Sequence, residues 1–220
     1  MLQPDSLPAF AAWLLGLVTL AAATASDIRT LEVEDWVWMP ALAYGIPFTA
    51  WSILTGRVNI FLLALAAVWA ILGLAVFITG AMGRADGLAV MSVALLTPQA
   101  AFFTLTYAFI ALIVTHISVA CVVNLTRQRR DRSYTKNLKK LGAPAAALLL
   151  TVAVKHPAPF HPEAGGKIYS EKTGRFTWFT DTEKEEEKPT EGDWVQLPMP
   201  AIPFLLASYA TMTLTLALFF

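Results

Sequence analysis

The chain has 220 residues, of which 56% are hydrophobic and 15% are charged, and its formal net charge is zero. Its mean hydropathy of +0.58 is higher than an ordinary soluble domain shows, so the composition predicts a membrane protein. Because the net charge is zero, the composition gives no reason to expect a general affinity for nucleic acid. The single cysteine, Cys121, cannot form an intrachain disulfide, and no ligand spacing or glycine-rich nucleotide motif predicts a metal or another cofactor.

The first apolar segment covers residues 7–26. Ala23-Thr24-Ala25 at its end resembles a signal-peptidase site, but no Lys or Arg occurs before Arg29, so the basic region of a signal peptide is missing. We therefore expect this segment to be a retained transmembrane helix.

Further apolar segments follow along the chain. A bilayer core of ~30 Å requires ~20 apolar residues in a helix. Segment 87–100 is short and contains Pro98, so it crosses only if its ends reach the interface or the bilayer thins around it. The sequence predicts an all-α polytopic membrane protein with six transmembrane helices, at 7–26, 36–54, 59–82, 87–100, 101–125 and 199–220. The expected domains are a five-helix membrane domain at 1–125, a cytoplasmic insert at 126–197 and the sixth helix at 198–220.

Basic residues are concentrated after the fifth expected helix. Since cytoplasmic loops carry an excess of Lys and Arg, this segment should be cytoplasmic. Five preceding crossings then place the N-terminus outside, and the sixth places Phe220 outside. The basic residues are Arg127, Arg129, Arg130, Arg132, Lys136, Lys139 and Lys140.

The insert contains two features of secondary structure. Residues 143–154 are apolar but short, which is typical of an interfacial or buried segment rather than a crossing. Residues 167–170 and 175–180 alternate around a turn at 171–174, which predicts a β-hairpin. The charge run 183–191 should be a solvated loop.

Two aspartates lie at the ends of expected spans. Asp27 follows the first span, and Asp86 lies between the third and the fourth. The predicted topology places both at the cytoplasmic boundary on different helices, where they can face each other. Two close carboxylates tend to share one proton, so one can act as a base and the other as an acid in amide hydrolysis. On position alone, helix caps or surface charges explain them equally well.

Two motifs resemble those of a known family. Residues 26–36 read SDIRTLEVEDW and look like the first motif of archaeal preflagellin and type IV prepilin peptidases, the G-x-G-D membrane aspartic peptidases. Residues 83–87 read GRADG and resemble the second motif, and 194–203 resemble the entry to the last helix of the preflagellin branch. The resemblance implies that Asp27 and Asp86 are the catalytic pair.

Other motif residues are candidates for substrate binding. The residues next to Asp86 are Gly83, Arg84, Ala85 and Gly87. Ala85 stands where the stricter motif has glycine, so the motif does not determine the conformation of this turn. Arg84 could hold Asp86 ionised, contact a substrate carbonyl or reach the membrane interface. The acidic residues after Asp27 could receive the basic residues of a leader or simply face water. These are Glu32, Glu34 and Asp35.

The resemblance implies an endopeptidase in the plasma membrane that removes short, basic leaders at the cytoplasmic face. Its partner would be a membrane-anchored precursor of the archaellin or type IV pilin kind. The cysteine-rich domain of bacterial prepilin peptidases is absent, so N-methylation of the product is not implied. A presenilin-like intramembrane protease is the alternative enzyme, and a transporter or scaffold is the non-enzymatic alternative. The sequence leaves the oligomeric state open.

Overall fold

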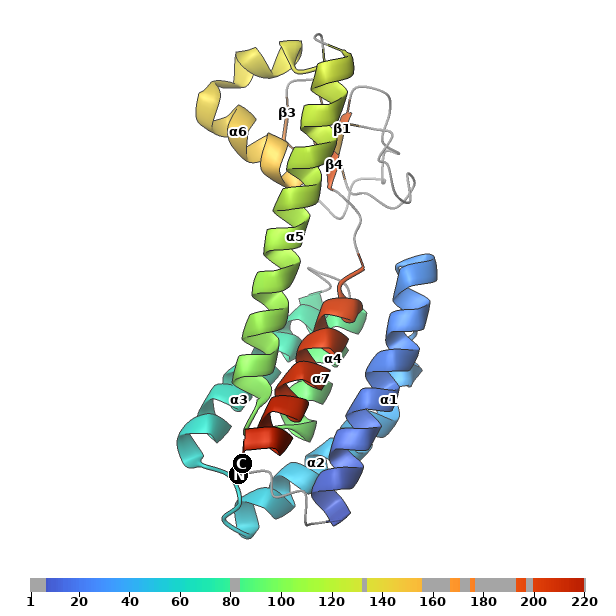
Figure 1. Cartoon of the computed structure of the whole chain (residues 1–220), viewed down its shortest axis with the longest axis vertical. Coiled ribbons are helices and arrows are strands. Elements are labelled where there is room, and N and C mark those ends of the chain that lie inside the picture. The colour runs from blue at the N-terminus through green and yellow to red at the C-terminus, as the bar shows by residue number, and fades with distance from the viewer. Residues whose placement is uncertain are drawn as a thin grey trace. The chain divides into compact units, whose positions relative to one another are not determined.

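The structure is a computed structural model that describes residues 7–79, 84–131, 134–155, 167–170, 175–176, 193–196 and 200–219. It divides into two compact units (Figure 1). The membrane unit comprises Met1–Leu112 and Pro200–Phe220, and the insert unit comprises Ile113–Met199. The long helix α5 passes from the first unit into the second.

Helices make up the described part of the membrane unit. They are α1 (Leu7–Thr30), the 3-10 turn η1 (Asp35–Trp38), α2 (Met39–Leu54), α3 (Ile60–Thr79), α4 (Arg84–Leu96), the first part of α5 (Ala101–Arg130) and α7 (Ile202–Phe219). Four segments are long and apolar enough to cross a membrane, namely Leu7–Thr30, Asp35–Leu54, Ile60–Thr79 and Ala101–Arg130. They correspond to the first, second, third and fifth expected helices. α7 contributes a shorter apolar stretch, Ile202–Met212.

The fourth expected helix differs most from its prediction. α4 has 13 residues and ends at Leu96, four residues before the predicted end. At 1.5 Å per residue it is about 20 Å long, which is shorter than a bilayer core. Pro98 explains the early end, because the residue before a proline is disfavoured in the α conformation. The chain turns there, with the Thr97 amide donating to Val93 and that of Ala101 donating to Thr97.

α4 is the central helix of the membrane unit. It contacts α1, α2, α3, α7 and η1, and Figure 1 shows α7 beside both α1 and α4. Its closest approach is to α3, where a Cβ added at Gly87 would lie 2.5 Å from the Gly73 carbonyl oxygen and 2.6 Å from the Phe77 nitrogen. Glycine is therefore required at position 87 for the two backbones to pack at this distance.

The insert unit contains a small sheet besides its helices. The β-hairpin prediction is confirmed by β2 (Lys167–Ser170) and β3 (Arg175–Phe176), which pair antiparallel with Tyr169 opposite Phe176. Two strands were not predicted, β1 (Ala153–Lys155) and β4 (Asp193–Gln196). β4 pairs with both β1 and β2, which gives the strand order β1-β4-β2-β3.

The apolar segment 143–154 is a short helix that runs into a strand. α6 (Ala143–Val152) continues directly into β1, after the 3-10 turn η2 (Lys136–Leu141). Asn124 of α5 fixes this junction, because its side-chain nitrogen donates at 2.8 Å to the carbonyls of Leu150 and Ala153. The Tyr134 hydroxyl donates at 2.8 Å to the Asn124 side-chain oxygen. The segment is therefore packed within the insert unit.

Candidate active site

Asp27 lies in the last turn of α1 and is only 7% exposed. Its carboxylate accepts a 2.8 Å hydrogen bond from the backbone N–H of Ile202, the first residue of α7. The N-terminal end of a helix has unpaired amides and a partial positive charge, so it is a favourable partner for a carboxylate. α1 and α7 therefore meet at Asp27.

The chain reverses direction directly after α1. Leu31 has a φ of 56°, a left-handed conformation that costs a residue other than glycine about 1 kcal/mol. The hydroxyls of Ser26 and Thr30 both donate to the Glu32 carbonyl, at 2.8 and 3.0 Å. This turn directs the following chain back to the unit, where Val33 and Trp38 are buried in the core.

Asp86 lies in the first turn of α4 and is partly buried. It precedes residue 87, where the fourth crossing was expected to begin. Burial, and secondly the charge of Asp27, raise the pKa of Asp86 to about 7. Asp27 therefore lies close enough to Asp86 for the two charges to interact. Ala85 is helical as well, so the second motif needs no left-handed residue at this position.

Arg84 joins the two motifs of the sequence. Its guanidinium lies 3.7 Å from an Asp35 carboxylate oxygen and 4.7 Å from the centre of the Phe77 ring. Asp86 is thus not its ion-pair partner among the described residues. Both side chains of the pair are substantially exposed, 63% for Arg84 and 43% for Asp35, so the pair contributes less than about 1 kcal/mol.

The remaining candidates for substrate binding have separate positions. Glu32 and Glu34 have exposed side chains, and the Glu34 carboxylate accepts a hydrogen bond from the Trp36 indole. Gly87 packs against α3, which gives it a structural role in this structure. Gly83 lies outside the described residues.

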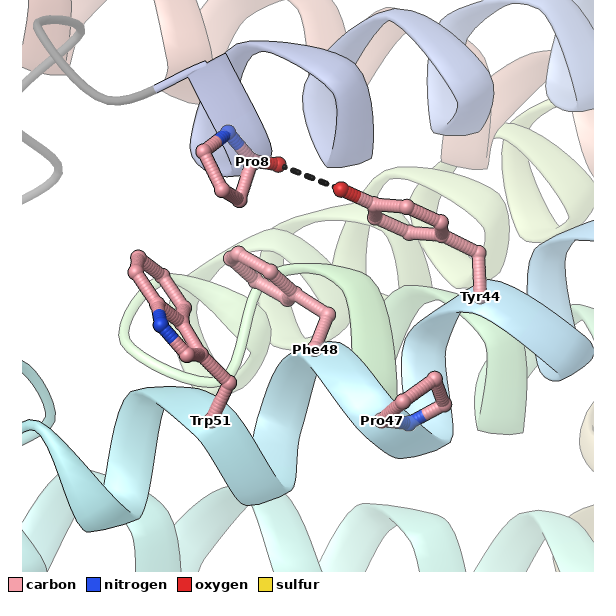
Figure 2. A pocket seen from close by; sticks show the side chains of 5 residues that line it. All are labelled: Pro8, Tyr44, Pro47, Phe48 and Trp51. Atoms are coloured by element: carbon pink, nitrogen blue, oxygen red, sulfur yellow. Dashed lines mark hydrogen bonds between the residues drawn. The ribbon is translucent and has the colours of Figure 1, made fainter.

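A small apolar pocket occurs at the other end of α1. Pro8 lines it together with four residues of α2, and the Tyr44 hydroxyl donates to the Pro8 carbonyl at 3.0 Å (Figure 2). Its volume is about 190 Å³. Pro8 is about 28 Å from Asp27 along α1, so this pocket is remote from the aspartates. The α2 residues are Tyr44, Pro47, Phe48 and Trp51.

The aspartate pair has the elements of acid–base hydrolysis. A carboxyl with a pKa near 7 retains a proton near neutral pH, and the hydrogen bond from Ile202 favours the anion of Asp27 against the effect of its burial. One group can donate a proton while the other accepts one, which amide hydrolysis requires.

No feature of the sequence predicted that the start of α7 contributes to this site. Pro200 and Pro203 mark a helix start, because proline fits the first turn of a helix. That signal predicts where α7 begins, but it does not predict that Ile202 binds Asp27. The turn at Leu31 was also not identified, since nothing in the composition of that loop marks a left-handed leucine.

Comparison with known proteins gives a match for the segment that contains Asp27 and Asp86. The model of the type IV leader peptidase family matches residues 14–117, a range that holds both aspartates. No curated protein and no solved structure gives a significant match. The resemblance of the two motifs to this family is therefore confirmed by the match of residues 14–117, which are less than half of the chain.

Proposed function

We propose that this protein is a membrane aspartic endopeptidase with Asp27 and Asp86 as its catalytic pair. The observation that carries the proposal is the coupling of two carboxylates from separate helices, α1 and α4, inside the segment that matches a leader peptidase family. The alternative is that the two aspartates are helix caps or surface charges. Neither of these roles accounts for a buried Asp27 close to an Asp86 with a raised pKa.

The reaction needs only these two groups and one water. The ionised carboxylate removes a proton from the water, and the resulting hydroxide attacks the scissile carbonyl carbon. The protonated carboxyl donates its proton to the carbonyl oxygen. When the tetrahedral intermediate collapses, the C–N bond breaks and the proton on the first carboxyl passes to the leaving amine. The second carboxyl recovers its proton as the carbonyl reforms.

The substrate would be a precursor of the archaellin or type IV pilin kind, with a short basic leader ahead of a hydrophobic helix. The site lies at the end of the unit where α1 ends and α4 and α7 begin. A precursor anchored by its own helix can present a cleavage site at such a helix end. The basic residues Arg29 and Arg84 belong to this end, which supports a cytoplasmic location.

Co-expression with a tagged precursor tests the proposal. We expect the wild-type chain to release the leader, seen as a gel shift, and to leave a product whose N-terminus lies just before the hydrophobic helix. Asp27→Asn and Asp86→Asn should insert normally and leave the precursor intact. A product cut inside the hydrophobic helix would favour an intramembrane protease, and cleavage by either variant would refute the assignment.

The orientation can be tested separately. The side chain of Lys136 is exposed in the insert unit, so Lys136→Cys in a Cys121→Ser background offers one thiol for labelling. We expect a membrane-impermeant maleimide to label it only after right-side-out vesicles are permeabilised. Labelling of intact vesicles would place the insert outside and refute a cytoplasmic site.

A further inference from the structure

The two aspartates have different surroundings. Asp27 is buried at the start of α7 and accepts a hydrogen bond from the Ile202 amide. Asp86 is partly exposed in the first turn of α4. No residue in the described part of the chain forms a hydrogen bond or an ion pair with its carboxyl. Among the described residues, one carboxylate thus has a backbone donor that favours its negative charge, and the other has none.

We propose that the N-terminal end of α7 is a positioning element that holds Asp27 as the ionised base and leaves the shared proton on Asp86. The backbone N–H of Ile202 is the group that makes this distinction. The catalytic meaning of the assignment rests on the proposed peptidase function, whereas the charge states of the two aspartates can be measured without a substrate.

Other charged groups near the two aspartates do not explain why Asp27 rather than Asp86 would be ionised. α2 and α7 carry no charged residue, and the elements around α1 contribute Arg84 and Asp86 on α4 and Asp35 on η1. Arg84 pairs with Asp35. Arg29, Glu32 and Glu34 of the first motif have exposed side chains, so solvent screens their effect on the buried Asp27. The α7 amide is therefore the principal partner of Asp27.

The assignment gives each step a named group. The Asp27 carboxylate takes the proton from the attacking water, and Asp86 protonates the carbonyl oxygen of the scissile bond. Asp27 then returns its proton to the leaving amine, and Asp86 regains its own as the carbonyl reforms. Each proton is accounted for, and no additional acid or base is needed.

A proline at position 202 removes the donor while retaining a residue that suits a helix start. Proline lacks the backbone N–H, and its fixed φ is compatible with the first position of a helix. Ile202 is also buried, at 1% exposure, so Ile202→Pro loses packing as well as the hydrogen bond. Ile202→Ala is the matched control, because it loses the packing and keeps the N–H.

Infrared titration of the purified protein in detergent reads the two carboxyl groups directly. At pH 6 we expect the wild type to show a protonated carboxyl band that persists in Asp27→Asn and disappears in Asp86→Asn. Relative to Ile202→Ala, the Ile202→Pro variant should convert Asp27 to its acid form about one pH unit higher, the size expected for the loss of a hydrogen bond to a charged group. The acidic limb of its cleavage rate should move by the same amount.

The outcomes separate the two proposals. A band that disappears in Asp27→Asn instead, or identical Asp27 titrations in Ile202→Pro and Ile202→Ala, would overturn the role of α7. If Ile202→Pro fails to fold, the spectra of the two aspartate variants still decide which group holds the proton. A wild-type protein that leaves the precursor uncut would refute the peptidase proposal and leave the titration result standing.

Discussion

Helices α3 and α4 follow each other in the chain, but they have opposite environments. α3 consists almost entirely of apolar residues, yet only Ala66 and Gly73 are buried in the protein. α4 is shorter, begins with Arg84 and Asp86, and buries seven of its 13 residues. Large apolar side chains on α3, such as Ile71 and Ile78, are 66% and 72% exposed.

This contrast separates contact with lipid from contact with protein. A helix that faces lipid needs apolar side chains but no particular shape, whereas a helix enclosed by others needs small residues where backbones approach. α4 meets this second requirement with Gly87, Ala89, Ser92 and Ala94. Hydropathy is therefore highest in the helix that faces outward, and the central helix with the catalytic candidate has the weaker signal.

The largest expected effect is the loss of activity when α4 loses its carboxyl. Asp86→Asn keeps the size of the side chain but cannot donate the shared proton, so we expect leader cleavage to fall by at least about 10³-fold. Ile71→Ala on α3 should cleave at nearly the wild-type rate. Cleavage is measured as initial rates of precursor processing in detergent, at equal amounts of folded enzyme. Equal losses in both variants would remove the functional contrast between the helices.

The second-largest expected effect is on stability, because α4 is packed more tightly than α3. In Gly87→Ala the new Cβ meets backbone atoms of Gly73 and Phe77, which cannot move aside as a flexible side chain can. We expect a loss of about 2 kcal/mol in stability and a Tm lower by about 4–8 °C. Ala67 on α3 is exposed, so Ala67→Leu should change the Tm far less. Thermal melts in one detergent make the comparison, and a stable Gly87→Ala protein would contradict the tight crossing.

The stability of the protein should also depend on pH through Asp86. The folded state raises the pKa of Asp86 to about 7, so between about pH 4 and pH 7 it binds more protons than the unfolded state. Its contribution to stability is therefore lost as pH rises through this range. We therefore compare the free energy of unfolding of Asp86→Asn with that of the wild type at each pH. Allowing for the partial exposure of Asp86, we expect this difference to shift in favour of the variant by on the order of 1 kcal/mol between pH 5 and pH 8. Melts of the two proteins at both pH values test the sign.

The smallest effect should come from the exposed face of α3. Ile71→Ala removes apolar atoms that pack on lipid or detergent rather than on protein, so the free energy of unfolding should change by less than about 0.5 kcal/mol. A loss of several kcal/mol would show that Ile71 is covered by protein, for example by a second copy of the chain, and cross-linking at that face would then identify the contact.

Local sequence signals identified several parts of this protein correctly. Long apolar segments predicted α1, α2, α3 and α5, because a membrane span depends on the composition of a single continuous segment. Alternation and a turn predicted the β2–β3 hairpin for the same local reason. The motifs around Asp27 and Asp86 pointed to the family that residues 14–117 match.

Tertiary structure decided the features that depend on two distant segments. Asp27 and Ile202 are 175 positions apart, so no local pattern could show that the start of α7 binds this carboxylate. The pairing of Arg84 with Asp35 and the approach of Gly87 to Gly73 likewise require α3, α4 and η1 to be packed together. The sequence by itself determined which segments are apolar and where the two aspartates lie along the chain. Only the packing of the helices decided the environment of each aspartate, because burial and hydrogen-bond donors come from residues far away in the sequence.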